Sequence, residues 1–253
     1  MSEHDRRALR DHWDRLSALD PDRSIIDPND RRGHKNRYLA GLRDTAMLES
    51  LLDVPAGSVL LDYGCGSGSG SRTLLQAGWQ VIGLDISTPL LQQARTRCAG
   101  HADHAMFATT DGRTVPLADG SIAAAITYGV LIYCVSDEEL VHLLGEFRRA
   151  LQPGGRLILV EQVKRQDRIA EQGLKRFRTI EAWHRHLTDA GFSVDRSTVL
   201  RHGRFPGTIA LQRGLVPRAL WRGMAKLERL VGAAGVAPWD YADVRLVARA
   251  PSA

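Results

Sequence analysis

The middle of the chain carries short runs of apolar residues that lack the polar alternation of a half-exposed strand. These runs are residues 59–61, 81–84, 105–108, 123–130 and 156–160. Such runs are typical of strands buried on both faces of a parallel sheet. Stretches with helical spacing separate several of them, at residues 71–77, 88–98 and 137–151. Strands that alternate with helices predict an α/β fold with a doubly wound sheet.

The chain before residue 58 has a different texture. Residues 1–36 are polar and irregular, with turn signals at 20–22 and 27–30. Apolar residues then recur at helical spacing from Tyr38 to Leu52, and Pro55 ends that helix. We interpret residues 1–57 as an N-terminal helical extension and expect it to fold over a bound ligand as a lid.

The carboxy-terminal third continues the domain that starts at residue 58. Charged residues 164–178 predict a linker or a helix, and further elements are expected as a helix at 180–190 and strands at 192–199 and 244–248. Residues 206–236, with Trp221 and Met224, predict an apolar helical insert before the last strand. We expect this insert to roof a substrate pocket; simple packing on the sheet and a homodimer contact are the alternatives. Residues 58–253 then form one domain.

Composition excludes several protein classes. The chain has 253 residues, of which 43% are hydrophobic and 25% charged, so disorder is not expected. Its three cysteines show no C-x-x-C spacing, which argues against a disulfide scaffold and against a metal site. The amino terminus lacks the apolar core of a secretory signal, and no apolar run approaches the ~20 residues that cross a bilayer. We expect a cytoplasmic protein with no membrane insertion.

The net charge of +5 comes almost entirely from arginine. Arginine binds phosphate in a bidentate manner, so a nucleic-acid partner is one interpretation. However, no block of five like charges occurs, and aromatic residues make up only 6% of the chain. A bias of codon usage toward arginine and alanine is the better explanation of the composition, and we do not expect a nucleic-acid partner.

A glycine-rich loop follows the first predicted strand, with the sequence Asp-Tyr-Gly-Cys-Gly-Ser-Gly at residues 62–68. Glycines allow a sharp turn and a close approach of a ligand, and the next helix directs its positive end toward that space. No Gly-x-Gly-x-x-Gly register fits, which disfavours dinucleotide binding. Asp85 ends the next strand, where a carboxylate can accept both hydrogens of a ribose diol. Asp111 and Gly112 follow the third strand, where they can address an adenine edge.

These motifs, together with Leu-Gln-Pro-Gly-Gly-Arg-Leu at residues 151–157, resemble class I S-adenosylmethionine-dependent methyltransferases. The similarity is to the small-molecule branch that includes ubiquinone and menaquinone biosynthesis methyltransferases, and it covers residues 58–162 most fully. It implies a Rossmann-like seven-stranded sheet with an antiparallel last strand, S-adenosylmethionine as cofactor, and in-line transfer of a methyl group to oxygen, nitrogen or carbon of a small acceptor.

The resemblance also implies roles for residues around the loop. Asp62 would lie near the cofactor ammonium, and the carbonyl of Tyr128 would accept from the same group. Three glycines would pass under its methionine and ribose, namely Gly64, Gly66 and Gly68.

The adenosine part of the cofactor is assigned in the same way. Asp85 would bind the ribose hydroxyls, Ile86 would pack on the adenine face, and Asp111 and Gly112 would contact its edge. Packing in the core is the alternative for Ile86.

The acceptor side departs from the family pattern. A histidine is common at the position of Tyr133, so the substrates of relatives cannot be assumed for this chain. A hydroxyl acceptor benefits from a general base, and Tyr133 and Glu161 are the candidates, although either is also explained as a structural residue. Two alternatives remain: an RNA methyltransferase, suggested by the arginines, and a non-catalytic S-adenosylmethionine-binding scaffold protein.

Overall fold

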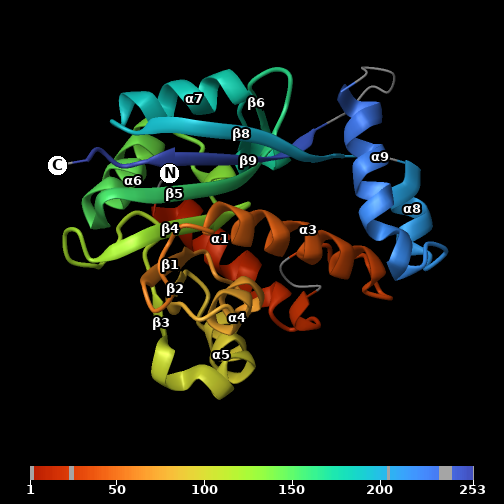
Figure 1. Ribbon diagram of the computed structural model, residues 1–253, viewed down its shortest axis with the longest axis horizontal. Helices are drawn as coiled ribbons and strands as arrows, with labels where there is room; N and C mark the ends of the chain where they lie inside the picture. The colour runs from red at the N-terminus through yellow and green to blue at the C-terminus, as the bar shows by residue number, and fades with distance from the viewer. Residues whose placement is uncertain (1–2, 23–25, 204–205, 234–240, 253) are drawn as a thin grey trace.

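A seven-stranded sheet forms the centre of the computed structural model, with strand order β3-β2-β1-β4-β5-β9-β8 (Figure 1). The structure describes residues 3–22, 26–203, 206–233 and 241–252. The strands of the sheet are β1 Val59–Tyr63, β2 Gln80–Asp85, β3 Ala105–Thr109, β4 Ile122–Tyr128, β5 Leu151–Val163, β8 Ser193–His202 and β9 Ala242–Arg249. Strand β9 runs antiparallel to both β5 and β8. The expected Rossmann-like sheet with an antiparallel last strand is therefore confirmed.

Helices cover both faces of the sheet because the strands are apolar on both faces. Successive residues of β1 show this, since Leu60 and Leu61 are both fully buried but belong to different core clusters. Three helices pack on the face that carries Leu60, namely α3 (His34–Ser50), α4 (Ser69–Gln76) and α5 (Thr88–Arg97). On the face of Leu61 pack α6 (Asp137–Ala150) and α7 (Ile180–Asp189). Short 3₁₀ turns, η1 (Ala99–His104) and η2 (Leu131–Tyr133), precede β3 and follow β4.

Two segments differ from the expectation drawn from their polar sequence. Within residues 1–36, helix α1 (Glu3–Leu16) forms where an irregular segment was expected. Residues 164–178 form a two-stranded hairpin instead of a linker or helix, with β6 (Arg168–Ala170), η3 (Glu171–Gly173) and β7 (Lys175–Phe177). Contacts with distant elements explain the hairpin, because Val163 bridges to Arg178, whose guanidinium donates to the Cys134 carbonyl (2.8 Å) and to Asp137 (3.0 Å).

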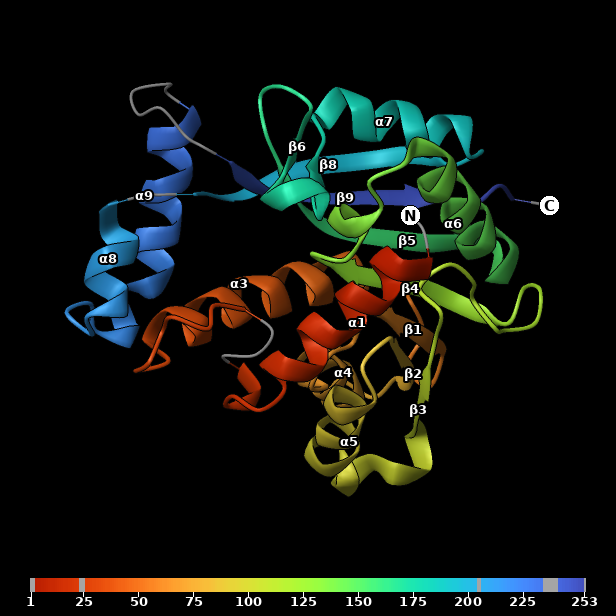
Figure 2. The same ribbon diagram turned by 180° about the vertical axis from the view of Figure 1, so that it is seen from behind.

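The insert projects beyond the end of the sheet (Figures 1 and 2). It contains α8 (Pro206–Gln212), η4 (Arg218–Leu220) and α9 (Trp221–Ala233), so the expected helical character is present, while residues 234–236 lie outside the described residues. Its buried side chains Leu211 and Ala225 pack on Tyr38 and Leu39 of α3. No helix in the described part of the chain is both long and apolar enough to span a bilayer.

Candidate functional site

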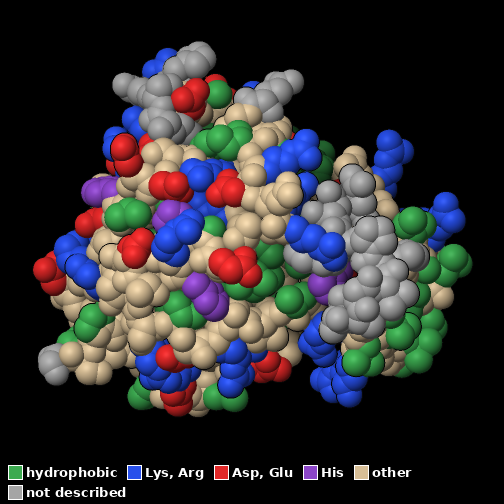
Figure 3. Space-filling model, turned by 90° about the horizontal axis from the view of Figure 1, so that it is seen from above, with side chains coloured by type: hydrophobic (Ala, Val, Ile, Leu, Met, Phe, Trp, Pro, Cys, Tyr) green, Lys and Arg blue, Asp and Glu red, His purple; other side chains and the backbone are tan. Residues whose placement is uncertain are grey.

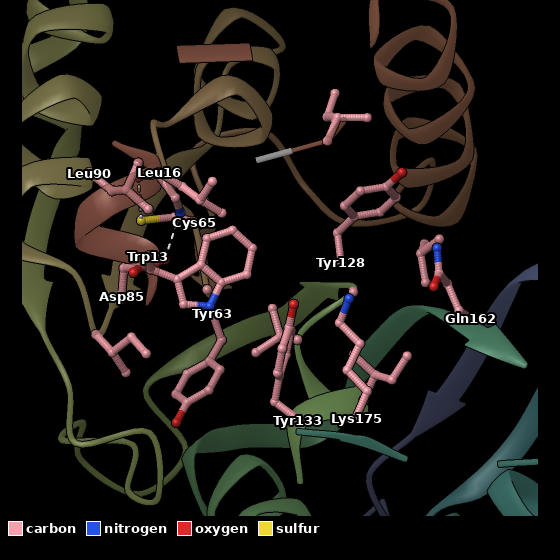
Figure 4. Close-up of a pocket in the computed structure, with 18 of the residues that line it drawn as sticks. Trp13, Leu16, Tyr63, Cys65, Asp85, Leu90, Tyr128, Tyr133, Gln162 and Lys175 are labelled. Carbon is pink, nitrogen blue, oxygen red and sulfur yellow. Dashed lines mark hydrogen bonds between the residues drawn. The ribbon is translucent and has the colours of Figure 1, made fainter. Parts of the chain in front are cut away.

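A cavity of about 640 Å³ lies where the parallel strands end, and α1, α3 and the β6–β7 hairpin contribute to its walls. Its volume lies in the range of small-molecule pockets, about 300–1,000 Å³. Figure 4 shows Asp85 and Leu90 on one side of this space and Tyr128 and Gln162 on the other, with Trp13, Tyr133 and Lys175 between them. The carboxyl ends of parallel strands are the usual position of a ligand in an open α/β sheet.

The glycine loop turns sharply beneath the cavity. Gly64, Gly66 and Gly68 all have positive φ angles, of 76°, 53° and 75°. A Cβ atom on Gly64 would lie 2.2 Å from the Val130 side chain, and one on Gly68 would lie 2.8 Å from the backbone of Ala94. Larger residues are therefore excluded at both positions. Gly64 and Gly66 line the cavity, whereas Gly68 supports the loop from behind as the N-cap of α4.

Asp62 is buried at the end of β1 and lines the cavity beside the loop. Its Oδ2 accepts from the Ser71 hydroxyl at 2.6 Å. Burial raises the pKa of Asp62, although this hydrogen bond and the nearby Arg43 guanidinium act in the opposite direction. In its ionised form this carboxylate would attract a cation that enters the cavity, as expected for the ammonium group that the family resemblance assigns to Asp62.

Asp85 ends β2 with its side chain toward the same cavity. The N–H groups of Gly66 (2.8 Å) and Ser87 (2.9 Å) donate to its two oxygens and hold the carboxylate in place. Burial raises the pKa of Asp85 to about 6, and these hydrogen bonds limit the increase. A carboxylate has about four acceptor sites, so Asp85 retains capacity for two hydroxyl groups of a ligand.

The residues expected around adenine are also brought to the cavity, since Ile86, Asp111 and Gly112 all line it. Gly112 has φ 77°, and a Cβ there would lie 3.4 Å from Ile86. Partial burial would raise the pKa of Asp111, but hydrogen bonds from Arg113 and Thr114 outweigh burial and lower it. Asp111 therefore stays ionised, with Oδ1 occupied by its own turn.

Aromatic side chains line the cavity beyond the end of β4. Trp13 of α1 meets Tyr133 of η2 edge to face, with ring centroids 5.8 Å apart. Lys175 reaches over the Tyr133 ring, with Nζ 5.4 Å from the centroid, and pairs with Glu171 at 3.0 Å. Burial raises the pKa of the Tyr133 phenol, which therefore stays protonated at neutral pH and does not act as a base.

Glu161 points away from this space and is absent from the described residues that line the cavity. Only 1% of it is exposed, and its oxygens accept from the N–H groups of Val130, Leu131 and Ile132 at 3.0–3.2 Å. Burial raises the pKa of Glu161 to about 7 against these hydrogen bonds. These contacts secure the η2 turn, which carries Tyr133 into the cavity.

Several lining residues were not assigned to the cavity from the sequence. Trp13 belongs to a helix that was not expected, and Lys175 to a hairpin that was expected to be a linker or helix. Arg43 was assigned only to a lid, but it is 4% exposed, lies against Tyr128 at 5.6 Å and donates to Ser69 at 2.9 Å. Its spacing of four residues from the apolar Leu39 and Met47 could have indicated an inward-facing cation on α3.

The insert contributes less to the cavity than its sequence suggested. No described residue of 206–233 lines the cavity, and α8 and α9 pack on α3 instead. The roof over a substrate pocket therefore stays a prediction. Among the residues that the structure describes, no cluster of histidine, cysteine and acidic side chains could hold a metal ion.

Comparison with known proteins shows what part of the chain is similar to. A family model described as a methyltransferase domain matches residues 60–155. Demethylmenaquinone methyltransferase of Tropheryma whipplei (strain Twist) is 35% identical over 112 residues, which cover 44% of this chain and 44% of that protein. The chain thus spans less than half the length of this relative.

Two solved structures share the fold across most of the chain. The cyclase SpnF superposes with a TM-score of 0.64 at 24% identity and covers 85% of this chain and 82% of its own. Geranyl diphosphate methyltransferase in complex with S-adenosylmethionine gives a TM-score of 0.64 at 20% identity, with coverage of 88% and 92%. One of the two is named a cyclase, so the fold by itself does not decide the reaction.

The matched segment and the cavity coincide. Residues 60–155 contain β1 to β4, the glycine loop and the carboxylates Asp62, Asp85 and Asp111. The sheet order also has the antiparallel strand between β5 and β8 that the resemblance implies. Residues 60–155 are thus similar to a methyltransferase domain, and the sheet around them has the order that the resemblance to class I S-adenosylmethionine-dependent methyltransferases implies.

Proposed function

We propose that this protein transfers the methyl group of S-adenosylmethionine to a small organic acceptor. The observation that carries the proposal is a single cavity with two unlike halves. Carboxylates and glycines at the ends of β1, β2 and β3 line one half, and aromatic side chains from α1, β4 and η2 line the other. A polar nucleoside cofactor suits the first half, and an acceptor with an apolar body suits the second.

When bound, the cofactor supplies a sulfonium methyl group that is electrophilic without further activation. The residues of the chain then have to orient the acceptor and exclude water. Asp62 and Asp85 hold the cofactor at its ammonium and ribose, while the backbone of Gly64 and Gly66 allows close approach. Arg43, beside Asp62 on the cavity wall, provides a cation for the carboxylate of the methionine part.

The acceptor half of the cavity contains charged side chains whose positive and negative charges are paired with each other. Its cations are paired, with Lys175 on Glu171 at 3.0 Å, Lys35 on Asp27 at 2.7 Å, and Arg201 on Asp243 at 3.2 Å. Trp13, Tyr128 and Tyr133 supply flat apolar surface between these pairs. We therefore assign an acceptor with a planar or apolar body and no large net charge. Tyr133 would donate a hydrogen bond to it, and Glu161 would act as a positioning residue for η2.

Calorimetry with the cofactor tests the first half of the cavity. Asp85→Ala removes the expected diol contact and should weaken binding by about 1–3 kcal/mol. Asp103→Ala, an exposed acid that does not line the cavity, serves as the control and should leave the affinity unchanged. Because ionised Asp85 is the better acceptor and its pKa is about 6, wild-type affinity should fall as the pH drops through 6. Unchanged affinity in Asp85→Ala would contradict the placement of the ribose.

Methyl transfer itself is tested with cofactor labelled on the methyl group and a panel of phenols, amines and carboxylic acids. We expect label to appear in at least one acceptor with a planar or apolar body, and transfer to fall in Trp13→Ala. Cofactor binding without transfer to any acceptor of the panel would favour the non-catalytic scaffold instead.

A further inference from the structure

The insert exposes large apolar side chains in a concentration not seen on the rest of the described surface. Ile209, Leu215, Leu220, Leu227 and Leu230 are between 54% and 70% exposed. We call these five residues the leucine surface. Scattered single apolar residues are normal on a protein surface, but a cluster of this size marks a contact site.

Three residues of the leucine surface form a stripe along η4 and α9. Leu220, Leu227 and Leu230 follow at intervals of seven and three residues, which places them on one side of a helix over about 15 Å. The opposite side of α9 is already used, since Ala225 and Glu228 are buried against the protein. Glu228 is held there by Tyr38 and by the His202 N–H. The exposed stripe is therefore a second apolar side of α9 that the fold does not cover within the described residues.

Cations run beside this stripe. Arg222, Lys226 and Arg229 are exposed and repeat at intervals of four and three residues, one position before Gly223, Leu227 and Leu230. Arg213 and Arg218 add two more exposed cations, while the only acid among residues 207–231 is the buried Glu228. Figure 3 shows hydrophobic and basic side chains next to each other at the end of the molecule where α8 and α9 project. The exposed charge of this segment is thus entirely positive.

We propose that the leucine surface and its cations attach the protein to a membrane surface rich in anionic lipid. A helix with aliphatic residues beside arginine and lysine lies flat in the lipid interface, where the leucines enter the acyl boundary and the cations contact headgroups. The long stems of arginine and lysine allow their charges to reach the headgroups from the side of the helix. The attachment is peripheral, in keeping with the absence of a membrane-spanning helix from the described residues.

Two other occupants fit the surface less well. A second copy of this chain would bring Arg222, Lys226 and Arg229 close to the same cations across a two-fold axis, which costs energy. An acidic protein helix needs a groove that receives its side chains, but none of the leucine-surface residues lines either of two cavities found in the described part of the chain. A projecting aliphatic stripe with cations is matched by a flat anionic surface.

Flotation of the full chain with vesicles tests the proposal. We expect binding to vesicles of phosphatidylcholine and phosphatidylglycerol in equal parts, weaker binding to pure phosphatidylcholine, and loss of binding as salt is raised. Leu227→Glu with Leu230→Glu should lower the affinity for vesicles roughly tenfold or more, because two leucine side chains that enter the acyl region on binding are lost. Arg222→Gln with Lys226→Gln should lower it roughly fivefold for each cation removed.

The matched control is Leu52→Glu with Met106→Glu, two residues that are 83% and 62% exposed away from the insert. These changes should leave vesicle binding unaltered, and thermal unfolding verifies that all variants are folded. Failure of the wild type to bind anionic vesicles at low salt would overturn the proposal. A dimer that Leu227→Glu with Leu230→Glu converts to a monomer would also overturn it and assign the surface to a second copy. The readout does not involve methyl transfer, so either result leaves the proposed activity untouched.

Discussion

Asp85 and Glu161 are both buried carboxylates on parallel strands, yet only Asp85 faces the cavity. Two backbone N–H groups hold Asp85 while leaving acceptor capacity for a ligand. The carboxylate oxygens of Glu161 instead accept hydrogen bonds from the Thr127 hydroxyl and from three consecutive N–H groups of residues 130–132. The orientation of each side chain therefore decides its contacts. The carboxylate of Asp85 faces the cavity, whereas that of Glu161 binds the backbone of the turn.

Glu161→Gln should change how the free energy of unfolding depends on pH. Burial raises the pKa of Glu161 to about 7 in the folded protein, above the ordinary value of 4.5 that the group has in an unfolded chain. Protonated Glu161 is therefore favoured in the folded state, and wild-type stability falls as the pH rises from about 4.5 to about 7. The variant lacks this loss, so its stability relative to wild type should increase by roughly 1–3 kcal/mol between pH 5 and pH 8. Urea unfolding at both pH values measures this; a constant difference would contradict the buried titration.

Helix α1 is held over the cavity mainly by polar contacts with α5. Asp14 accepts from the Ser87 hydroxyl at 2.6 Å, and the Ser17 carbonyl accepts from Gln93 at 2.7 Å. The same helix directs Leu9, Trp13 and Leu16 to the cavity. An element that is joined to its neighbours through a few hydrogen bonds at one end can open without unfolding the sheet, which fits the lid expected of this segment.

Asp14→Ala tests the lid by removing its contact with Ser87. We expect the cofactor to dissociate roughly threefold to tenfold faster, because one hydrogen bond to a charged group is lost while the contacts to the cofactor remain. Stopped-flow displacement measures the rate. Asp11→Ala, an exposed acid on the same helix, is the matched control and should dissociate like wild type. Equal rates in both variants would show that α1 does not gate the site.

The molecule separates its core from its cavity. Trp183 of α7 is 1% exposed within the core cluster on the face of α6 and α7, and it does not line the cavity. Helix α1 and the glycine loop lie at the edge where the parallel strands end. Stability and ligand binding therefore depend on different residues.

Trp183→Ala should destabilise the protein by about 3–5 kcal/mol, because it opens a cavity in the core. Trp183→Phe should cost less, since most of the ring volume is kept and the buried Trp183 Nε1 has no hydrogen-bond partner to lose. Denaturant midpoints give the two values. Cofactor affinity at a temperature where both variants are folded should match wild type, and a large decrease would show that the core and the site are coupled.

The sequence by itself determined the sheet and the group of glycines and carboxylates that meet at its edge. Apolar runs without polar alternation indicate strands that are buried on both faces. Glycines at 64, 66 and 68 indicate a turn in which side chains would clash. Both patterns involve only residues that are close together in the chain. Position along the strands then places Asp62, Asp85 and Asp111 at one edge of the sheet. The oligomeric state and the substrate roof remain predictions.

The tertiary structure alone decided the other half of the cavity. Trp13 lies in a segment expected to be irregular, and Lys175 in one expected to be a linker or a helix. Contacts such as Asp14 with Ser87 and Val163 with Arg178, which join residues far apart in the chain, place both at the cavity. The position of Glu161 after an apolar run did not show whether its side chain lines the cavity. A side chain near the end of a strand can face either a ligand or the backbone of a neighbouring turn. Short-range pattern specifies which strands form, whereas long-range contacts decide which side chains meet.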